Sequence, residues 1–194
     1  ETCGLNLGSL DNKPWQLAFL ICEGNRILDS KNFWLRWPDL KVSPDAARIT
    51  GWTKTKYNKL AVDPKEPLEL FEKYLYNDEY IKVGHNLLGF DVYIHNINRL
   101  LLGKRTDYSY INNLIDTNCI AKAIKMNINF NDDEGLLSWQ YRMSDIRQKG
   151  IKTNLRQLCK DYEIEFYPSK LHDALYDIEK NFEVFHKLIW AFEI

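Results

Sequence analysis

The sequence predicts an α/β sandwich. Two extended apolar stretches open the chain, and helical and strand-like segments alternate after them. The 194 residues are enough for one domain with a substantial core. No internal repeat, low-complexity tract or linker interrupts them, so we expect a single domain over residues 1–194.

The composition is that of an ordinary folded protein, with 45% apolar residues, 13% aromatic residues and a net charge of −1. This composition excludes a disordered chain. The near-neutral net charge neither requires nor excludes binding to nucleic acid, because a protein of this net charge can still have a local basic groove.

No apolar run reaches membrane-spanning length and no signal peptide is visible, so we expect a cytoplasmic protein in a reducing compartment. The four cysteines include no C-x-x-C pair, which favours buried reduced thiols over a zinc site.

The first two predicted elements are strands. Residues 15–22 (WQLAFLIC) are a short run of β-compatible apolar types, and residues 27–37 (ILDSKNFWLRW) resume an extended pattern. Gly24 and Asn25 lie between the two runs, which predicts a hairpin turn.

Two helices are predicted next. Ser43 can cap a brief helix, Pro44 suits its first turn and Gly51 can end it. Residues 66–77 (EPLELFEKYLYN) have the pattern of an amphipathic helix. Its apolar side consists of Leu68, Phe71, Tyr74 and Leu75.

The second half of the chain alternates strands, helices and loops. A short strand ending in a glycine turn is predicted at residues 80–86, followed by a strongly patterned helix over residues 87–103. The remaining predicted elements are a strand or turn and a helix over 110–125, a loop over 127–135, a capped helix over 153–164 and a final helix over 171–192.

Two aspartates lie on or near the apolar stripes of their predicted helices. Asp91 follows Leu87 by four residues and precedes Ile94 by three, so it shares their apolar stripe. Asp177 lies close to the edge of the apolar stripe of the final helix. One such carboxylate alone is readily explained as a buried Asp satisfied by a helix N-terminus or an arginine. Glu1 is a third acid, in a glycine-containing turn. Because hard cations such as Mg²⁺ bind a few carboxylates together with phosphate oxygens, the three acids together predict a polynuclear metal site.

Three short motifs follow one another along the chain: ETCG at residues 1–4, HNLLGFD at 85–91 and HDALYD at 172–177. They resemble the tail of D-x-E-T-x-G, then N-x-x-x-F-D and H-x-x-x-x-D, which in this order are the signatures of the DEDDh 3′–5′ exonucleases. The proofreading subunit of bacterial DNA polymerase III belongs to that family. SPDAARITGWT at 43–53 and LIDTNCIAK at 114–122 are similar to further segments of the family.

This resemblance implies a ribonuclease H-like three-layer sandwich, with a central mixed sheet flanked by helices. It covers nearly the whole chain except residues 127–152, a possible loop or insertion. In the family's pattern one more acid stands two positions before the glutamate. We therefore expect that acid, and most of the family's first strand, to lie upstream of Glu1.

The resemblance further implies a metal-dependent exonuclease that releases nucleoside monophosphates from DNA 3′ ends, in proofreading or repair. Glu1, Asp91 and Asp177 would bind two divalent ions, Mg²⁺ or Mn²⁺, which activate a water and stabilise the departing oxygen. His172 would be the general base, because an imidazole can accept a proton at neutral pH. Taken alone, His172 would be interpreted as a helix-capping or surface histidine.

Substrate contacts are implied at the same motifs. Backbone amides from Thr2 to Gly4 would approach the terminal nucleotide, and Leu5 would stack or wedge against its base. Asn86 and Phe90 would shape the site, although Phe90 also suits the core. The expected partner is the 3′ end of a single strand, DNA rather than RNA, together with a DNA polymerase or another replication protein.

Several other residues have two interpretations. Residues 139–152 (WQYRMSDIRQKGIK) combine basic and aromatic side chains, which suits either a flap that guides a single strand or a solvated helix or hairpin. Asp116 suits the site or the N-cap of the following helix equally well. We interpret His85 as structural, and His95 and His186 as helix-surface or packing residues.

Two alternative functions stay open. An exonuclease that trims RNA 3′ ends carries the same motifs, because the motifs do not separate the two sugars. A catalytically impaired nucleic-acid-binding module would keep the fold without binding the ions.

Overall fold

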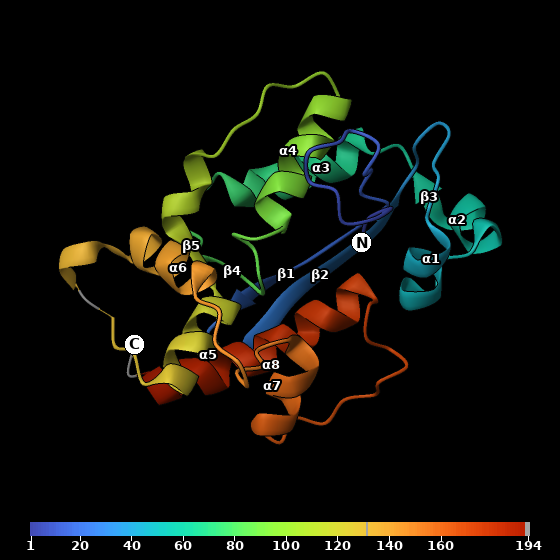
Figure 1. The fold of residues 1–194 in the computed structure, drawn as a ribbon. Coiled ribbons are helices and arrows are strands. Elements are labelled where there is room, and N and C mark those ends of the chain that lie inside the picture. Colours follow the sequence, from blue (N-terminus) through green and yellow to red (C-terminus); the bar gives the residue numbers. More distant parts are fainter. Residues whose placement is uncertain (131, 193–194) are drawn as a thin grey trace.

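The computed structural model describes residues 1–130 and 132–192, so Asn131 of the predicted loop lies outside the described residues. Strands and helices alternate along the chain, which confirms the α/β class (Figure 1). The strands are β1 Gln16–Glu23, β2 Arg26–Leu35, β3 Ala61–Val62, β4 Lys82–Gly84 and β5 Leu114–Asp116. The helices are α1 Pro44–Thr50, α2 Lys54–Leu60, α3 Lys65–Leu75, α4 Asp91–Leu101, α5 Thr117–Met126, α6 Leu136–Asp145, α7 Leu155–Asp161 and α8 Ala174–Phe192, with short 3₁₀ turns at Ser109–Asn113 and Asp132–Glu134.

The strands form two sheets in the described part of the chain. β1 and β2 pair antiparallel, with Gln16 opposite Trp34, and β3 joins β2 in parallel, so the three-stranded sheet is mixed. β4 and β5 form a separate parallel pair. The single central sheet that we expected is thus divided in the described residues, because no strand pairing joins β1 to β4.

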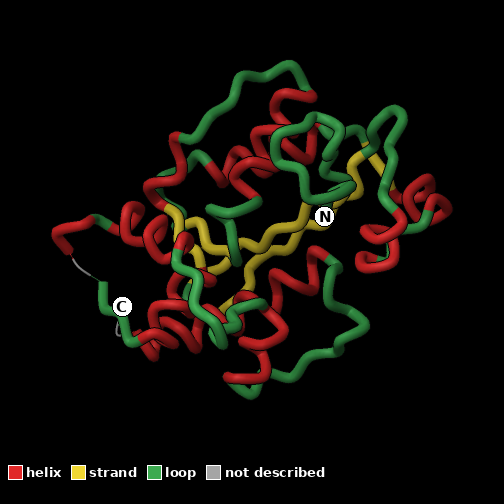
Figure 2. Tube along the Cα trace, in the orientation of Figure 1, coloured by secondary structure: helices red, strands yellow, loops and turns green. Residues whose placement is uncertain are grey.

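Helices lie on both sides of the strands (Figure 1). α3 covers β1 on one side, where the ring of Phe19 lies 5.3 Å from that of Phe71 and 6.0 Å from that of Tyr74. α8 packs against β1, β2 and β4, and so spans both sheets. Figure 2 shows β1 and β2 as a long ribbon through the middle of the molecule, with the N-terminus beside it. The N-terminus therefore lies beside the central strands.

The early elements form as the sequence predicts. The hairpin between β1 and β2 turns at Gly24, which has a φ of 56°. Ser43 caps α1 by accepting a hydrogen bond from Ala46 N at 3.1 Å, and Gly51 ends the helix with a φ of 67°. Glycine adopts this left-handed conformation without a steric cost, so both turns follow directly from the residue types.

Two helices begin later than predicted. α4 begins at Asp91, four residues later than expected, because residues 86–90 form a turn. α8 begins at Ala174, three residues later than expected, and Asp173 caps it by accepting from Tyr176 N at 3.2 Å. Both helices therefore start inside the motifs that the sequence singles out.

The sequence patterns did not predict α2 or β3, and they left a flap, a helix or a hairpin open for the residues that include most of α6. α2 has a visible cap, since Thr53 accepts from Lys56 N at 3.2 Å, but Tyr57 is its only residue described as buried, so the helix has no apolar stripe. β3 has two residues, which is too short to display an alternating pattern. α6 lies within residues 127–152, which the family resemblance does not cover.

A large buried cluster lies among α5, α6, α7 and α8. Trp139 of α6 is fully buried in it, so the flap interpretation of residues 139–152 is wrong for this side chain. Arg142 lies on the exposed side of α6 and pairs with Glu134 at 2.6 Å. Trp139 therefore contributes to the core and cannot stack against a bound strand.

Three of the four cysteines have the buried, reduced thiol that we expected, and Cys22 is the exception. All four cysteines are free; Cys3, Cys119 and Cys159 are buried, whereas Cys22 is half-buried. Burial raises the pKa of the Cys119 thiol to about 12, so this side chain stays protonated. Among the described residues, no helix combines the length and apolar character that crossing a membrane requires.

Candidate active site

Glu1 is fixed beside the start of β1 by backbone pairing. Its nitrogen donates to Gln16 O at 2.8 Å, and its carbonyl accepts from Trp15 N at 2.9 Å and from Gln16 N at 3.2 Å. Thr2 extends this pairing through an isolated antiparallel bridge to Pro14. The Glu1 side chain therefore projects from a backbone that β1 holds in place.

His172 and Asp177 are joined at the start of α8. The backbone nitrogen of His172 donates to both carboxylate oxygens of Asp177, at 3.2 and 3.1 Å. His172 has a φ of 71°, a left-handed conformation that is uncommon outside glycine, and these hydrogen bonds stabilise the turn. His172 lies before the first residue of α8 and is exposed, so it is not part of the helix that we predicted from residue 171.

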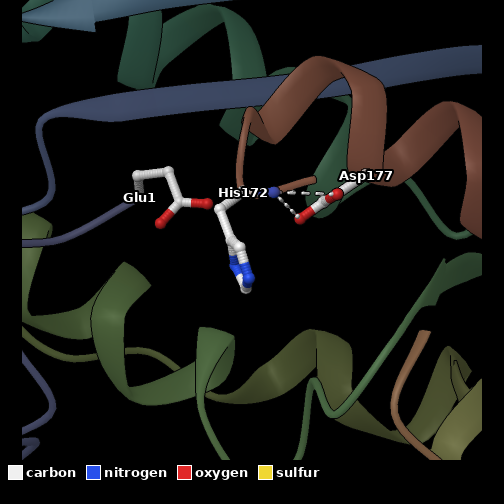
Figure 3. A group of neighbouring side chains, drawn as sticks. All are labelled: Glu1, His172 and Asp177. Atoms are coloured by element: carbon white, nitrogen blue, oxygen red, sulfur yellow. Dashed lines mark hydrogen bonds between the residues drawn. The ribbon is translucent and has the colours of Figure 1, made fainter. Parts of the chain in front are cut away.

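Glu1, His172 and Asp177 form one group although they come from opposite ends of the chain (Figure 3). One potential ligand atom from each residue lies within 4.8 Å of the other two. Burial, assisted by the charge of Glu1, raises the pKa of Asp177 to about 6. The tertiary structure thus brings together three of the four residues to which we assigned the chemistry.

Asp91 is not a member of this close group, although the charge of Glu1 reaches it. It is the first residue of α4 and is exposed, so its predicted place on a buried stripe with Leu87 and Ile94 is wrong. The reason is the late start of α4, which leaves Leu87 outside the helix. Part of the Asp91 residue is in contact with solvent, but protein atoms surround its carboxyl group at longer range and reduce the hydration of its charged form. This desolvation raises the pKa of the carboxyl group to about 7, and the charges of Asp116 and Glu1 add to the rise.

Asp116 fixes the turn that leads into Asp91. Its carboxylate accepts from Asn86 N at 2.8 Å and Leu88 N at 3.1 Å. It also accepts from Asn118 N at 3.0 Å as the N-cap of α5, which confirms the capping interpretation. One buried carboxylate therefore holds both the second motif and the start of α5.

Gln140 of α6 holds Asp116 in turn. Its Oε1 accepts from Asp116 N at 2.6 Å, and its Nε2 donates to Leu114 O at 2.9 Å. The side-chain amide thus takes the place of a neighbouring strand at the edge of β5. Sequence reasoning missed this role, because a single polar residue on a helix carries no sign of its distant partner.

Gln16 connects Glu1 to the start of α8. Its backbone pairs with Glu1, while its side chain donates to Asp173 Oδ2 and accepts from Ala174 N, each at 3.4 Å. Its Nε2 also donates to Asn32 Oδ1 at 3.1 Å. Gln16 is buried, so these bonds satisfy an amide that would otherwise be costly to bury. The sequence analysis did not identify this role of Gln16. The feature that could have indicated it is a single polar residue inside the apolar run WQLAFLIC.

The residues expected to contact substrate differ in accessibility. Thr2 is buried and its hydroxyl donates to Gly4 O at 2.6 Å, so its side chain is engaged within the turn. Leu5 is 86% exposed and lines, with Gly4, an open pocket of about 470 Å³. Asn86 is exposed and Phe90 is half-buried. Leu5 and Asn86 are therefore the members of this set most open to a ligand.

The other three histidines lie away from the close group. Nδ1 of His85 lies 3.0 Å from Thr117 Oγ1, and burial lowers the pKa of the His85 ring to about 4. His95 is buried on α4, and the half-buried His186 packs edge-on against Phe182 at 4.6 Å. These positions agree with their interpretation as structural and packing residues.

The close group suits a divalent cation chemically. Two carboxylates and one imidazole can bind Mg²⁺, Mn²⁺ or Zn²⁺, with the imidazole favouring the latter two. Burial and the neighbouring charge of Glu1 disfavour ionised Asp177, and a cation between the acids would offset both effects. Glu1 and Asp177 are the natural ligands, and the ring of His172 is exposed beside them (Figure 3).

No protein-family model and no curated protein matches this chain. Among solved structures, the zinc-bound form of an E. coli ExoI–ssDNA complex is similar, with a TM-score of 0.73 and 18% sequence identity. The match covers 97% of this chain and 38% of that chain, so this protein spans well under half of the similar structure. At this identity the likeness shows a shared fold.

Proposed function

We propose that this protein is a metal-dependent 3′–5′ exonuclease that hydrolyses phosphodiester bonds at DNA 3′ ends and releases nucleoside monophosphates. The observation that carries the proposal is the convergence of Glu1, His172 and Asp177 within 4.8 Å. The fold likeness supports it, since the similar structure holds single-stranded DNA and a zinc ion. As part of the same proposal, we assign to this chain the ribonuclease H-like three-layer sandwich that the sequence motifs imply.

Glu1, Asp91 and Asp177 would hold two divalent ions, Mg²⁺ or Mn²⁺. Such a pair supplies an activated water and stabilises the oxygen that departs from phosphorus. Two of these acids already lie together, and Asp91 is near enough for the charge of Glu1 to raise its pKa.

The side chains of this site would divide the work. His172 accepts the proton of the attacking water through its exposed ring, while its backbone is held by Asp177. Leu5, which is largely exposed, contacts the terminal base, and Asn86 and Phe90 shape the site beside it. Asp116 keeps the turn of the second motif in place without contacting substrate.

We assign the enzyme to proofreading or repair, beside a DNA polymerase or another replication protein. The single-stranded DNA in the similar structure favours a DNA end as substrate. The alternative is an enzyme that trims RNA 3′ ends. A contact to the 2′-hydroxyl of the substrate would distinguish RNA from DNA as the substrate.

The test uses matched DNA and RNA oligonucleotides labelled at the 5′ end, with Mg²⁺, Mn²⁺, Zn²⁺ or EDTA. We expect products that shorten progressively from the 3′ end of DNA with Mg²⁺ or Mn²⁺, and no products with EDTA. His172→Asn should lower the hydrolysis rate by about 10²–10⁴-fold, the usual contribution of a general base, without weakening oligonucleotide binding.

Faster shortening of RNA than of DNA would replace the proposal with RNA trimming. Binding of the oligonucleotides without hydrolysis in any of the three ions would instead identify a nucleic-acid-binding module.

A further inference from the structure

The loop between α7 and α8 places a lysine between two aromatic rings. Nζ of Lys170 lies 5.0 Å from the ring centre of Tyr167 and 5.7 Å from that of Tyr176. The hydroxyl of Tyr176 accepts a hydrogen bond from Tyr167 N at 2.7 Å, which ties the loop to the first turn of α8. The ammonium group is thus held by ring faces, an interaction that orients a cation without neutralising it.

The charge of Lys170 has no carboxylate partner among the ion pairs of the described residues. Lys180 provides the contrast, because its Nζ lies 5.5 Å from the ring centre of Tyr176 but pairs with Glu183 at 2.8 Å. Lys170 is exposed on the surface, and Tyr167 beside it is 54% exposed. One of the two lysines on this ring is therefore available to an external anion.

The lysine lies next to the candidate active site along the chain. Lys170 precedes His172 by two residues, and Tyr176 directly precedes Asp177. Consecutive Cα atoms are about 3.8 Å apart, so the backbones of Lys170 and His172 are at most roughly 7.6 Å apart. A strand whose scissile phosphate lies at the close group would bring a neighbouring phosphate within reach of a lysine side chain.

We propose that Lys170, oriented by Tyr167 and Tyr176, binds the phosphodiester backbone of a single strand next to the bond that is cleaved. The exposed face of Tyr167 offers a stacking surface for a base, as aromatic side chains do in proteins that bind single strands. This inference rests on the proposed function and specifies where that substrate runs. The contact is to the backbone, so it is independent of base sequence.

The test measures how oligonucleotide affinity depends on salt. Fluorescently labelled dT and dA oligonucleotides are titrated with the full chain in Ca²⁺ at several NaCl concentrations, and gels verify that the strands stay intact. Each phosphate contact in a single strand contributes about 0.7 to the slope of log K against log[salt]. We expect Lys170→Gln to reduce the slope by about 0.7 for both oligonucleotides and to weaken binding, whereas Lys170→Arg retains the slope.

Lys180→Gln is the matched control, because it removes a lysine from the same ring that is already paired. It should leave the slope unchanged. Tyr167→Ala should weaken binding without removing the charge, and thermal unfolding shows whether each variant is folded. An unchanged slope in folded Lys170→Gln, an equal reduction in Lys180→Gln, or no binding by the wild type would overturn the inference.

Failure of the proposed function gives a different result. A wild-type protein that binds with the Lys170-dependent slope but hydrolyses neither DNA nor RNA would refute the exonuclease and retain the backbone contact. Hydrolysis of an oligonucleotide, together with a salt dependence of binding that Lys170→Gln does not change, would support the exonuclease and refute the backbone contact of Lys170.

Discussion

Asp177 makes two contacts that have different consequences. Its carboxylate accepts the backbone N–H of His172, and a carboxylate oxygen also lies in the close group with Glu1. The first contact fixes a backbone turn, whereas the second places two acids side by side. A substitution at this position can therefore act on the shape of the turn, on cation binding, or on both.

Asp177→Asn separates these effects, because the amide keeps an oxygen that can accept from His172 N but loses the charge. We expect Mn²⁺ affinity, measured by calorimetry, and hydrolysis to fall by more than about 100-fold, since even residues behind metal ligands cost 10–100-fold. Glu179→Gln, on the same helix, is the control and should alter neither. Retention of wild-type Mn²⁺ affinity in Asp177→Asn would contradict the assignment of this carboxylate as a ligand.

At the scale of elements, a polar side chain joins β1 to the start of α8. Gln16 of β1 bonds to Asp173 and Ala174 across 157 and 158 residues of chain. The same residue pairs with the backbone of Glu1. The relative placement of the first and third motifs therefore depends on one strand residue and the first turn of one helix.

Gln16→Leu tests this dependence with a side chain of similar size. We expect the free energy of unfolding to fall by about 0.5–1.5 kcal/mol, the net contribution of a typical hydrogen bond, because Asn32, Asp173 and Ala174 lose their bonds to Gln16 while water can reach Asn32. Mn²⁺ affinity should also fall, by roughly 10-fold, as for other residues that orient ligands.

Thr53→Ala is the control for this variant, because it removes the cap of α2, which contributes no residue to the candidate site. It should cost about 0.5–2 kcal/mol of stability and leave Mn²⁺ affinity unchanged. Equal Mn²⁺ affinity in Gln16→Leu and the wild type would show that β1 does not position the site.

At the scale of the whole molecule, a cluster of largely buried polar groups ties α3 to α4 and to the segment that follows α4. Glu72 of α3 accepts from His95 Nε2 at 3.2 Å and from Lys104 Nζ at 2.7 Å, and it pairs with Arg99. Nδ1 of His95 lies 3.2 Å from Tyr110 Oη. A neutral imidazole with its proton on Nε2 satisfies both contacts, so the folded state favours uncharged His95.

This preference makes stability depend on pH. Burial, with a contribution from Arg99, lowers the pKa of His95 from 6.5 to about 4, although Glu72 opposes the change. Between these values the unfolded chain binds a proton that the folded chain does not. Stability from this residue is therefore present above about pH 6.5 and is lost as pH falls toward 4, by roughly 3 kcal/mol.

The measurement is urea unfolding of wild type and His95→Phe from pH 4.5 to 7.5. Asp91 and Asp177 have raised pKa values and shift stability in the opposite direction, so the difference between the two proteins is the relevant quantity. We expect His95→Phe to be less stable at pH 7 and to lose less stability on acidification. Parallel pH profiles would contradict a neutral, buried His95.

The sequence by itself determined the α/β class, the hairpin, the cap and end of α1, and the three motifs. Each of these depends on residues that are neighbours in the chain, where glycine turns, capping side chains and apolar periods can be read directly. The same local patterns placed the starts of α4 and α8 too early. Both helices begin at turns that distant groups help to fix: Asp116 holds the turn before α4, and Gln16 bonds to the first turn of α8.

Only the tertiary structure decided that Glu1, His172 and Asp177 meet in one close group without Asp91, and that Trp139 belongs to the core. It also decided the partners of Gln16 and Gln140. The physical reason is that a buried polar side chain must find its hydrogen-bond partner in space, which for Gln16 lies more than 150 residues away, and a local sequence pattern contains no record of that partner.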